Sequence, residues 1–280
     1  MSISDLFEEI EIADGVLNKI LILDVERLPG ITRQYWWERG DLKNRYIHYE
    51  TVEREPRTTI MCAKWHDSDE VMQFAEWDKG GRRQFLRKIH ALISRADIVI
   101  GHNALKADLP WVLGDFRFPR IGCKAKFELL PDLPPFKVVD TLSHFRSRYK
   151  SGLPFKGLDA ALQIMGHTGK TDRYDPQAME RAVAGSVEDR ERLTAYCAGD
   201  VLGTQWLYDR ERPMMKNHPA LFVEGKDKLT ICNRCGHDTE PTPRRYIAGV
   251  MTYSMRKCVS CEAYSRLSIE PERISTVRGV

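Results

Sequence analysis

Several acidic residues are spaced so that a fold could bring their oxygens together. Asp24 and Glu26 end an apolar run, and residues two apart on a strand project from the same face. Tyr196 precedes Asp200 by four residues, so both would lie on one face of a helix. Asp108 lies between these pairs, just before a segment that reads as the start of a helix. Hard anions gathered in one place bind Mg²⁺ or Mn²⁺, so we expect the four carboxylates to hold two such ions.

Four of the seven cysteines form two closely spaced pairs near the C-terminus, Cys232 with Cys235 and Cys258 with Cys261. Two tight turns that each offer two thiolates are the usual ligands of one tetrahedral Zn²⁺. The other cysteines are scattered singly in apolar surroundings, which is typical of reduced, buried thiols. We therefore predict one structural zinc ion, held by Cys232, Cys235, Cys258 and Cys261.

Apolar periodicity predicts the elements that must position these residues. Strands are expected over residues 16–25, 58–65, 71–77, 97–100 and 138–140, and helices over 82–95, 158–165 and 187–210. The strands at 58–65 and 71–77 are expected to pair antiparallel. The predicted fold class is therefore α/β, a mixed sheet flanked by helices, followed by a small zinc ribbon.

The length of 280 residues favours two unequal domains, which we place at 1–224 and 225–280. The net charge of +3 arises from 43 basic and 40 acidic residues, a balance that permits a nucleic-acid partner without indicating one. No apolar stretch approaches the roughly 18 residues of a membrane span, and the first residues do not form a secretion signal. We expect a soluble, cytoplasmic protein.

An insertion at residues 31–57 interleaves aromatic and basic side chains. Trp36 or Trp37 could stack on a base of a nucleic acid while the basic residues neutralise phosphates. The alternative is that these aromatic side chains cover a sheet edge, because acidic residues nearly cancel the positive charge of the segment.

Three motifs in this order resemble those of the DEDD superfamily of 3′–5′ exonucleases, over roughly residues 20–212. Asp24-x-Glu26 resembles the first motif. Asn103 and Asp108 resemble the second, in the spacing of the proofreading domains of family B DNA polymerases, although Ala107 replaces the usual aromatic residue. Tyr196 and Asp200 resemble the third motif of the tyrosine subclass.

The resemblance implies a ribonuclease H-like fold and two-metal hydrolysis of phosphodiester bonds at the 3′ end of single-stranded DNA. Asp24 would bridge both ions, Glu26 and Asp200 would complete the site that activates water, and Asp108 would hold the other ion. Tyr196 would orient the attacking water, and Asn103 would position the substrate or the turn. Two alternatives stay open: an RNA-trimming exoribonuclease of the same superfamily, and a non-catalytic protein that binds nucleic acid.

Basic residues of the C-terminal module and several polar residues between the three motifs could also have a role. Arg244 and Arg245 are expected to contact phosphates, with Arg256 and Lys257 beside them, although docking onto a replication or repair protein would explain the same residues. His102 is expected to be a packing histidine, Asp140 and Asp159 capping residues, and Lys170 part of a loop.

Overall fold

The computed structural model describes residues 11–33, 47–149, 157–267 and 271–273. The chain forms two compact units. The larger unit comprises Lys19–Ile164 and Thr168–Gln205, and the smaller unit comprises Met1–Asn18, Met165–His167 and Trp206–Val280. We consider each unit separately.

A five-stranded mixed sheet forms the centre of the larger unit, in the order β5-β4-β1-β6-β7. Its strands are β1 (Ile20–Leu28), β4 (Arg57–Trp65), β5 (Met72–Ala75), β6 (Ile98–Gly101) and β7 (Lys137–Asp140). β1 pairs antiparallel with β4 and parallel with β6. β5 extends the antiparallel side, as predicted, and β7 extends the parallel side. A central strand covered on both faces is expected to be almost continuously apolar, which is how β1 begins.

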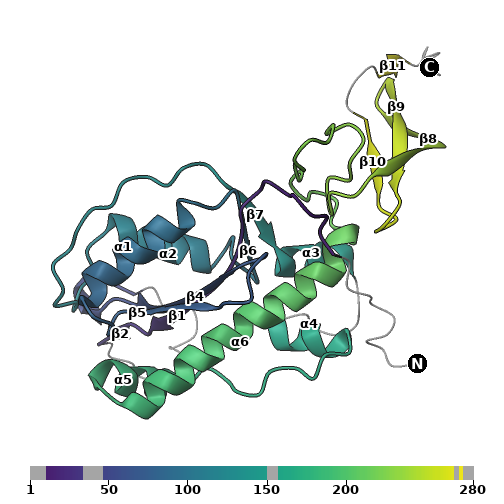
Figure 1. The fold of residues 1–280 in the computed structure, drawn as a ribbon. Coiled ribbons are helices and arrows are strands. Elements are labelled where there is room, and N and C mark those ends of the chain that lie inside the picture. Colours follow the sequence, from purple (N-terminus) through teal and green to yellow (C-terminus); the bar gives the residue numbers. More distant parts are fainter. Residues whose placement is uncertain (1–10, 34–46, 150–156, 268–270, 274–280) are drawn as a thin grey trace, which may run out of the picture. The chain divides into compact units, whose positions relative to one another are not determined.

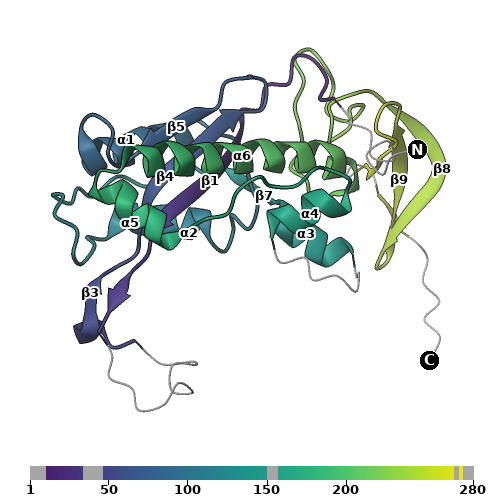
Figure 2. The same ribbon diagram turned by 90° about the horizontal axis from the view of Figure 1, so that it is seen from below.

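Helices cover both faces of this sheet. The helices α1 (Gly81–Ile93) and α2 (Asp108–Arg117) lie on one face (Figure 1), where Leu21 and Leu23 pack in a core with Phe85. The helices α5 (Pro176–Ala184) and α6 (Val187–Glu211) lie on the other face, where α6 runs across β1 and β4 (Figure 2). Because side chains alternate along a strand, Asp24 and Glu26 point to the face opposite Leu21 and Leu23, the face that α6 covers.

The remaining elements of the larger unit are shorter. They are β2 (Ile31–Thr32), a 3₁₀ turn at Tyr49–Thr51, β3 (Val52–Arg54), α3 (Thr141–Arg148) and α4 (Leu158–Ile164). β2 and β3 pair antiparallel within the predicted insertion, whereas Trp36 and Trp37 lie outside the described residues. The predicted α/β class with a mixed sheet is confirmed. Neither α3 nor α5 was predicted, and β1 begins later and ends later than the predicted strand.

The smaller unit contains a second sheet, made of β8 (Thr239–Ala248), β9 (Met251–Cys258), β10 (Tyr264–Arg266) and β11 (Glu272–Arg273). β8 pairs with β9, and β10 and β11 also pair with β9. The N-terminal segment belongs to this unit, since the Ala13 amide donates to the Cys235 carbonyl and the Leu17 amide to that of Phe222. The unit is therefore larger than the module at residues 225–280, whose status as a separate domain stays a prediction.

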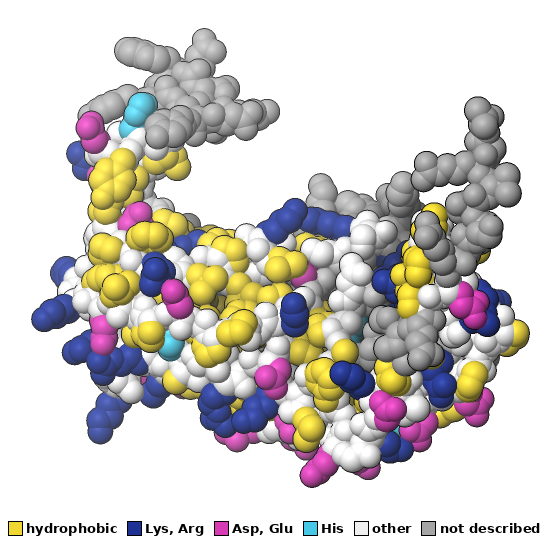
Figure 3. Space-filling view, turned by 90° about the horizontal axis from the view of Figure 1, so that it is seen from above, with side chains coloured by type: hydrophobic (Ala, Val, Ile, Leu, Met, Phe, Trp, Pro, Cys, Tyr) yellow, Lys and Arg dark blue, Asp and Glu magenta, His cyan; other side chains and the backbone are white. Residues whose placement is uncertain are grey.

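Charged side chains of both signs are mixed over much of the surface. On the face drawn in Figure 3, basic side chains (dark blue) are interrupted by acidic ones (magenta) and by apolar side chains (yellow). This mixture mirrors the near balance of basic and acidic residues in the sequence. In the described ranges, no helix combines the length and the apolarity that a bilayer span requires.

Candidate active site and cysteine centre

Three of the predicted carboxylates lie together in the larger unit. Oxygens of Asp24, Glu26 and Asp200 all lie within 4.8 Å of one another. Asp24 and Glu26 come from β1, and Asp200 comes from the face of α6 that packs on this strand. Cys197, three residues before Asp200, is buried and its thiol lies 3.4 Å from the Asp24 carbonyl oxygen, so it fixes the contact between helix and strand.

Asp108 lies outside this group of three, although its charge acts on it. It is the first residue of α2 and is 5% exposed. The N-cap of this helix is Ala107, whose side chain cannot accept a capping hydrogen bond. The repulsion between Asp108 and Asp24 is among the causes that raise the pKa of Asp24, after burial itself.

The turn that delivers Asp108 follows β6. Gly101 must be a glycine here, because a Cβ would come within 2.7 Å of the Ala104 Cβ. Asn103 adopts a left-handed conformation (φ 74°). The Asp140 carboxylate accepts hydrogen bonds from the amides of Asn103 and Leu105, at 3.1 and 3.0 Å, and from Ser143, where it caps α3. The prediction that Asp140 is a capping residue is confirmed, whereas the role of Asn103 stays a prediction.

The carboxylates of this site are difficult to ionise together. Burial, then repulsion from Asp108, Glu26 and Asp200, raises the pKa of Asp24 well above its ordinary value. Burial, then Asp200, raises the pKa of Glu26 to about 8. Burial also raises the pKa of Asp108 to about 7 and raises that of Asp200. Like charges in a buried site must bind either protons or cations.

One oxygen shows directly that the site is incomplete without a further group. Asp24 Oδ2 is buried and has no hydrogen-bond partner among the described residues. An unsatisfied buried carboxylate oxygen is costly, and a divalent cation would satisfy it. The residues present therefore fit a divalent metal ion.

A lysine that the sequence did not single out as a site residue contacts this group. Lys170 Nζ donates to Asp200 Oδ2 at 2.5 Å and to the Tyr196 hydroxyl at 3.0 Å. Burial lowers the pKa of Lys170, but Asp200 and Tyr196 more than offset this, so the ammonium group is stabilised. Burial raises the pKa of Tyr196 to about 12, so its hydroxyl stays protonated at neutral pH.

The loop before Lys170 is shaped by Asp159, which accepts a hydrogen bond from the Lys170 amide at 2.8 Å. Gly169 has a φ of 83°, and a Cβ there would come within 2.7 Å of Asp159 Oδ1. Neighbouring glycines marked a turn in the sequence, but nothing in their spacing indicated that the lysine would reach α6.

The remaining predictions concern residues in other elements. Arg244 and Arg245 lie on β8 of the smaller unit. His102 Nδ1 lies 2.8 Å from the Thr141 hydroxyl, and burial lowers the pKa of His102 to about 4, so the ring is neutral. A buried, neutral ring agrees with the predicted packing role.

The four paired cysteines form a closed centre in the smaller unit. All four are buried, and their sulfur atoms lie within 4.8 Å of one another. The Cys232–Cys261 and Cys235–Cys258 sulfur distances are 3.6 and 3.5 Å. A tetrahedral zinc ion with Zn–S bonds of about 2.3 Å requires sulfur atoms about 3.8 Å apart. The cysteines therefore fit one zinc ion with no ligand position left open.

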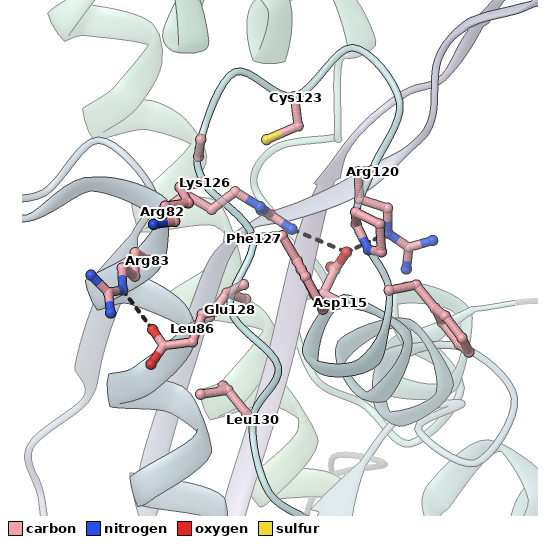
Figure 4. Close-up of a pocket in the computed structure, with 13 residues that line it drawn as sticks. Arg82, Arg83, Leu86, Asp115, Arg120, Cys123, Lys126, Phe127, Glu128 and Leu130 are labelled. Carbon is pink, nitrogen blue, oxygen red and sulfur yellow. Dashed lines mark hydrogen bonds and ion pairs between the residues drawn. The ribbon is translucent and has the colours of Figure 1, made fainter.

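A cavity of about 60 Å³ elsewhere in the larger unit is lined by several basic residues (Figure 4). Three of its arginines pair with carboxylates that also line it. Asp115 pairs with Arg82 at 3.0 Å and with Arg120 at 2.7 Å, and Glu128 pairs with Arg83 at 2.6 Å. These ion pairs distinguish the cavity from the carboxylate site, where like charges repel one another.

No model of a known protein family matches the chain, and no curated protein matches it in sequence. Among solved structures, the chain is similar to the family B DNA polymerase from the hyperthermophilic archaeon Pyrobaculum calidifontis, with a TM-score of 0.46 and 17% sequence identity. The match covers 70% of this chain and 25% of the polymerase chain.

Proposed function

We propose that this chain has a ribonuclease H-like fold and is a metal-dependent 3′–5′ exonuclease that acts on single-stranded DNA. The observation that carries the proposal is the partly buried, mutually repelling group of Asp24, Glu26 and Asp200, in which one buried Asp24 oxygen has no hydrogen-bond partner among the described residues. The order of the three motifs along the chain supports the polarity and the substrate class.

Asp24, Glu26, Asp108 and Asp200 would hold two Mg²⁺ or Mn²⁺ ions. When bound, such ions lower the pKa of an attacking water and stabilise the leaving oxygen. Asp108 and Asp200 are buried and Asp24 and Glu26 are partly buried, so the interaction of the site with a phosphate and its counterions is stronger than in water.

Tyr196 and Lys170 would act beside the carboxylates. The protonated Tyr196 hydroxyl can donate a hydrogen bond to a water or phosphate oxygen, and Lys170 fixes its orientation. Lys170 also holds Asp200 in place, which makes it a positioning residue. Asn103 would orient the 3′ nucleotide from its strained turn. Trp36 and Trp37 remain proposed base contacts in a segment outside the described residues.

Cys232, Cys235, Cys258 and Cys261 would hold one structural zinc ion. Arg244 would contact a phosphate of the substrate. Arg245, which was also predicted to do so, instead donates to the Ser254 hydroxyl within its own sheet. Arg256 likewise donates to Thr239.

The test is incubation of the purified protein with matched single strands of DNA and RNA, labelled at the 3′ or the 5′ end, with Mn²⁺ or without divalent ions. The proposal expects immediate release of the 3′ label as a mononucleotide, progressive shortening of the 5′-labelled strand, and no reaction without the ion. Faster trimming of RNA would favour the exoribonuclease alternative. Binding of strands without cleavage under any of these conditions would favour the non-catalytic alternative.

A further inference from the structure

One face of the sheet in the smaller unit carries aromatic and basic side chains together. Residues directly opposite each other in paired strands project from the same face. Tyr246 pairs with Tyr253, and Arg266 pairs with Met255, two residues further along β9. Tyr264 on β10 precedes Arg266 by two residues and therefore shares this face. We call this face, formed by Arg244, Tyr246, Tyr253, Tyr264 and Arg266, the tyrosine platform.

The side chains of the platform are arranged as stacked pairs. The Arg266 guanidinium lies 4.9 Å from the centre of the Tyr253 ring and 5.2 Å from that of Tyr246. Arg244 lies 5.2 Å from the centre of the Tyr264 ring. Tyr246 and Tyr264 are 44% and 37% exposed. The rings thus hold two guanidinium planes at the surface, where they are already ordered.

The two platform arginines carry uncompensated charge. Among the described residues, no ion pair joins Arg244 or Arg266 to a carboxylate, whereas neighbouring Lys257 pairs with Glu262 at 2.8 Å. Arginines on the opposite face are engaged within the sheet, since Arg245 donates to Ser254 and Arg256 to Thr239. The guanidinium groups that stack on rings and have no carboxylate partner among the described residues therefore lie on the face that carries the tyrosines.

We propose that the tyrosine platform binds single-stranded DNA, with bases stacked on its rings and guanidinium planes and phosphates paired with Arg244 and Arg266. Bases stack on both aromatic rings and arginine planes, and they are accessible in this way only when unpaired. The free positive charge complements a polyanion, whereas an apolar protein surface would have to desolvate both arginines without compensation. The choice of DNA rests on the proposed function, but the binding itself does not depend on cleavage.

The experiment measures binding of labelled oligo(dT) by fluorescence anisotropy, with the full chain carrying Asp24→Asn so that no strand is cut. Adding Tyr246→Leu and Tyr253→Leu should weaken binding on the order of tenfold, because leucine retains apolar area but cannot stack. The matched pair Tyr246→Phe and Tyr253→Phe should bind like the parent. Arg245→Ala on the opposite face should change affinity less than about twofold, whereas Arg266→Ala should also reduce the slope of log affinity against log salt by about 0.7.

Zinc content and the thermal midpoint, measured for each variant, separate loss of folding from loss of binding. Unchanged affinity of a folded, zinc-loaded leucine variant would overturn the inference and leave the platform to a protein partner. An equal loss of affinity for heparin, which has no bases, would overturn the stacking, and tighter binding of oligo(U) would overturn the assignment to DNA. Platform-dependent binding by a parent chain that cleaves nothing would support this inference while contradicting the proposed function.

Discussion

The carboxylate group of the larger unit and the cysteine centre of the smaller unit are both suited to metal ions, but they differ in how completely the protein satisfies them. The cysteine sulfurs are fixed at nearly the spacing of a tetrahedral site, and backbone amides of Arg234 and Cys261 point at them from 3.4 Å. The carboxylates repel one another, and within the described part of the chain one oxygen of Asp24 has no hydrogen-bond partner.

This difference is the one expected between a structural metal site and a reactive one. Four thiolates fill every position of a zinc ion, so neither water nor substrate can enter. Three or four carboxylates leave positions on a hard cation for water and phosphate oxygens. The carboxylates of the larger unit repel one another, whereas the sulfur atoms of the smaller unit form a complete set of zinc ligands. This pattern is expected when only the carboxylate group performs chemistry.

The largest effect is expected from Cys258→Ser, which removes one thiolate from the closed centre. Zinc binding supplies much of the folding free energy of small metal-dependent modules, on the order of 10 kcal/mol. Zinc content should fall from one ion per chain to none, and amides of β8 and β9 should lose hydrogen-exchange protection. Cys123→Ser, at a single cysteine of the larger unit, is the matched control. Retention of one zinc ion by Cys258→Ser would show that zinc binding does not require all four sulfur atoms.

Asp24→Asn is expected to remove cleavage almost completely, because it weakens the binding of an ion that contributes several kcal/mol to the transition state. We expect a loss of about 10³-fold or more in single-turnover rate, with the fold and the zinc ion retained. Asp132→Asn, at a carboxylate that is 86% exposed, should cleave like the parent. Comparable rates for Asp24→Asn and the parent would refute the site.

The grouping of Asp24, Glu26 and Asp200 could be predicted because its signal in the sequence is local. Asp24 and Glu26 follow an apolar run, and the period of two fixes both side chains on one face of β1. The four-residue spacing of Tyr196 and Asp200 within a long helix gave a second local signal. The cysteine pairs were equally clear, since their spacing is itself the geometry of the centre.

Lys170 could not be predicted as a site residue, because its position depends on how a loop folds back onto α6. The contact joins residues 30 positions apart and requires the left-handed Gly169 and the Asp159 hydrogen bond. The tyrosine platform was missed for a similar reason. Alternation along β8 separates Arg244 from Arg245, but the platform also requires β10 to pair with β9, which brings Arg266 beside the rings of Tyr246 and Tyr253, and no sequence pattern reveals this pairing.

Tyr196→Phe is expected to have a smaller effect than loss of a carboxylate. The hydroxyl orients a reacting oxygen but holds no ion, so turnover should fall on the order of 10²-fold while affinity for Mn²⁺ stays the same. Tyr49→Phe, at an exposed ring in the larger unit, controls for loss of a hydroxyl alone. A Tyr196→Phe protein with parental turnover would leave the hydroxyl without a catalytic role.

The smallest effect concerns stability and pH when no divalent ion is added. The folded-state pKa values of Glu26 and Asp108 are about 8 and about 7, whereas their ordinary values are 4.5 and 3.8. At a pH between the ordinary and the folded-state values, the folded chain therefore binds more protons than the unfolded chain. The stability that this binding provides is present at acidic pH and is lost as the pH rises through 7 and 8. The thermal midpoint should fall by about 4 °C or more between about pH 5.5 and pH 8.5.

Added Mn²⁺ should remove most of this decrease, and Glu26→Gln should flatten the pH profile, because the glutamine cannot titrate. Identical profiles for Glu26→Gln and the parent would contradict the assigned repulsion. Zinc content must be constant throughout, so the divalent ions are removed by dialysis without a strong chelator.

The most direct test of the contrast between the two centres is a Mn²⁺ titration followed by electron paramagnetic resonance, on the parent, Asp24→Asn and Asp132→Asn, with zinc content measured on the same samples. The account predicts two Mn²⁺ ions per chain in the parent and in Asp132→Asn, loss of this binding in Asp24→Asn, and one zinc ion in all three proteins. Equal Mn²⁺ binding by Asp24→Asn and the parent would contradict the claim that the buried carboxylates form the reactive metal site.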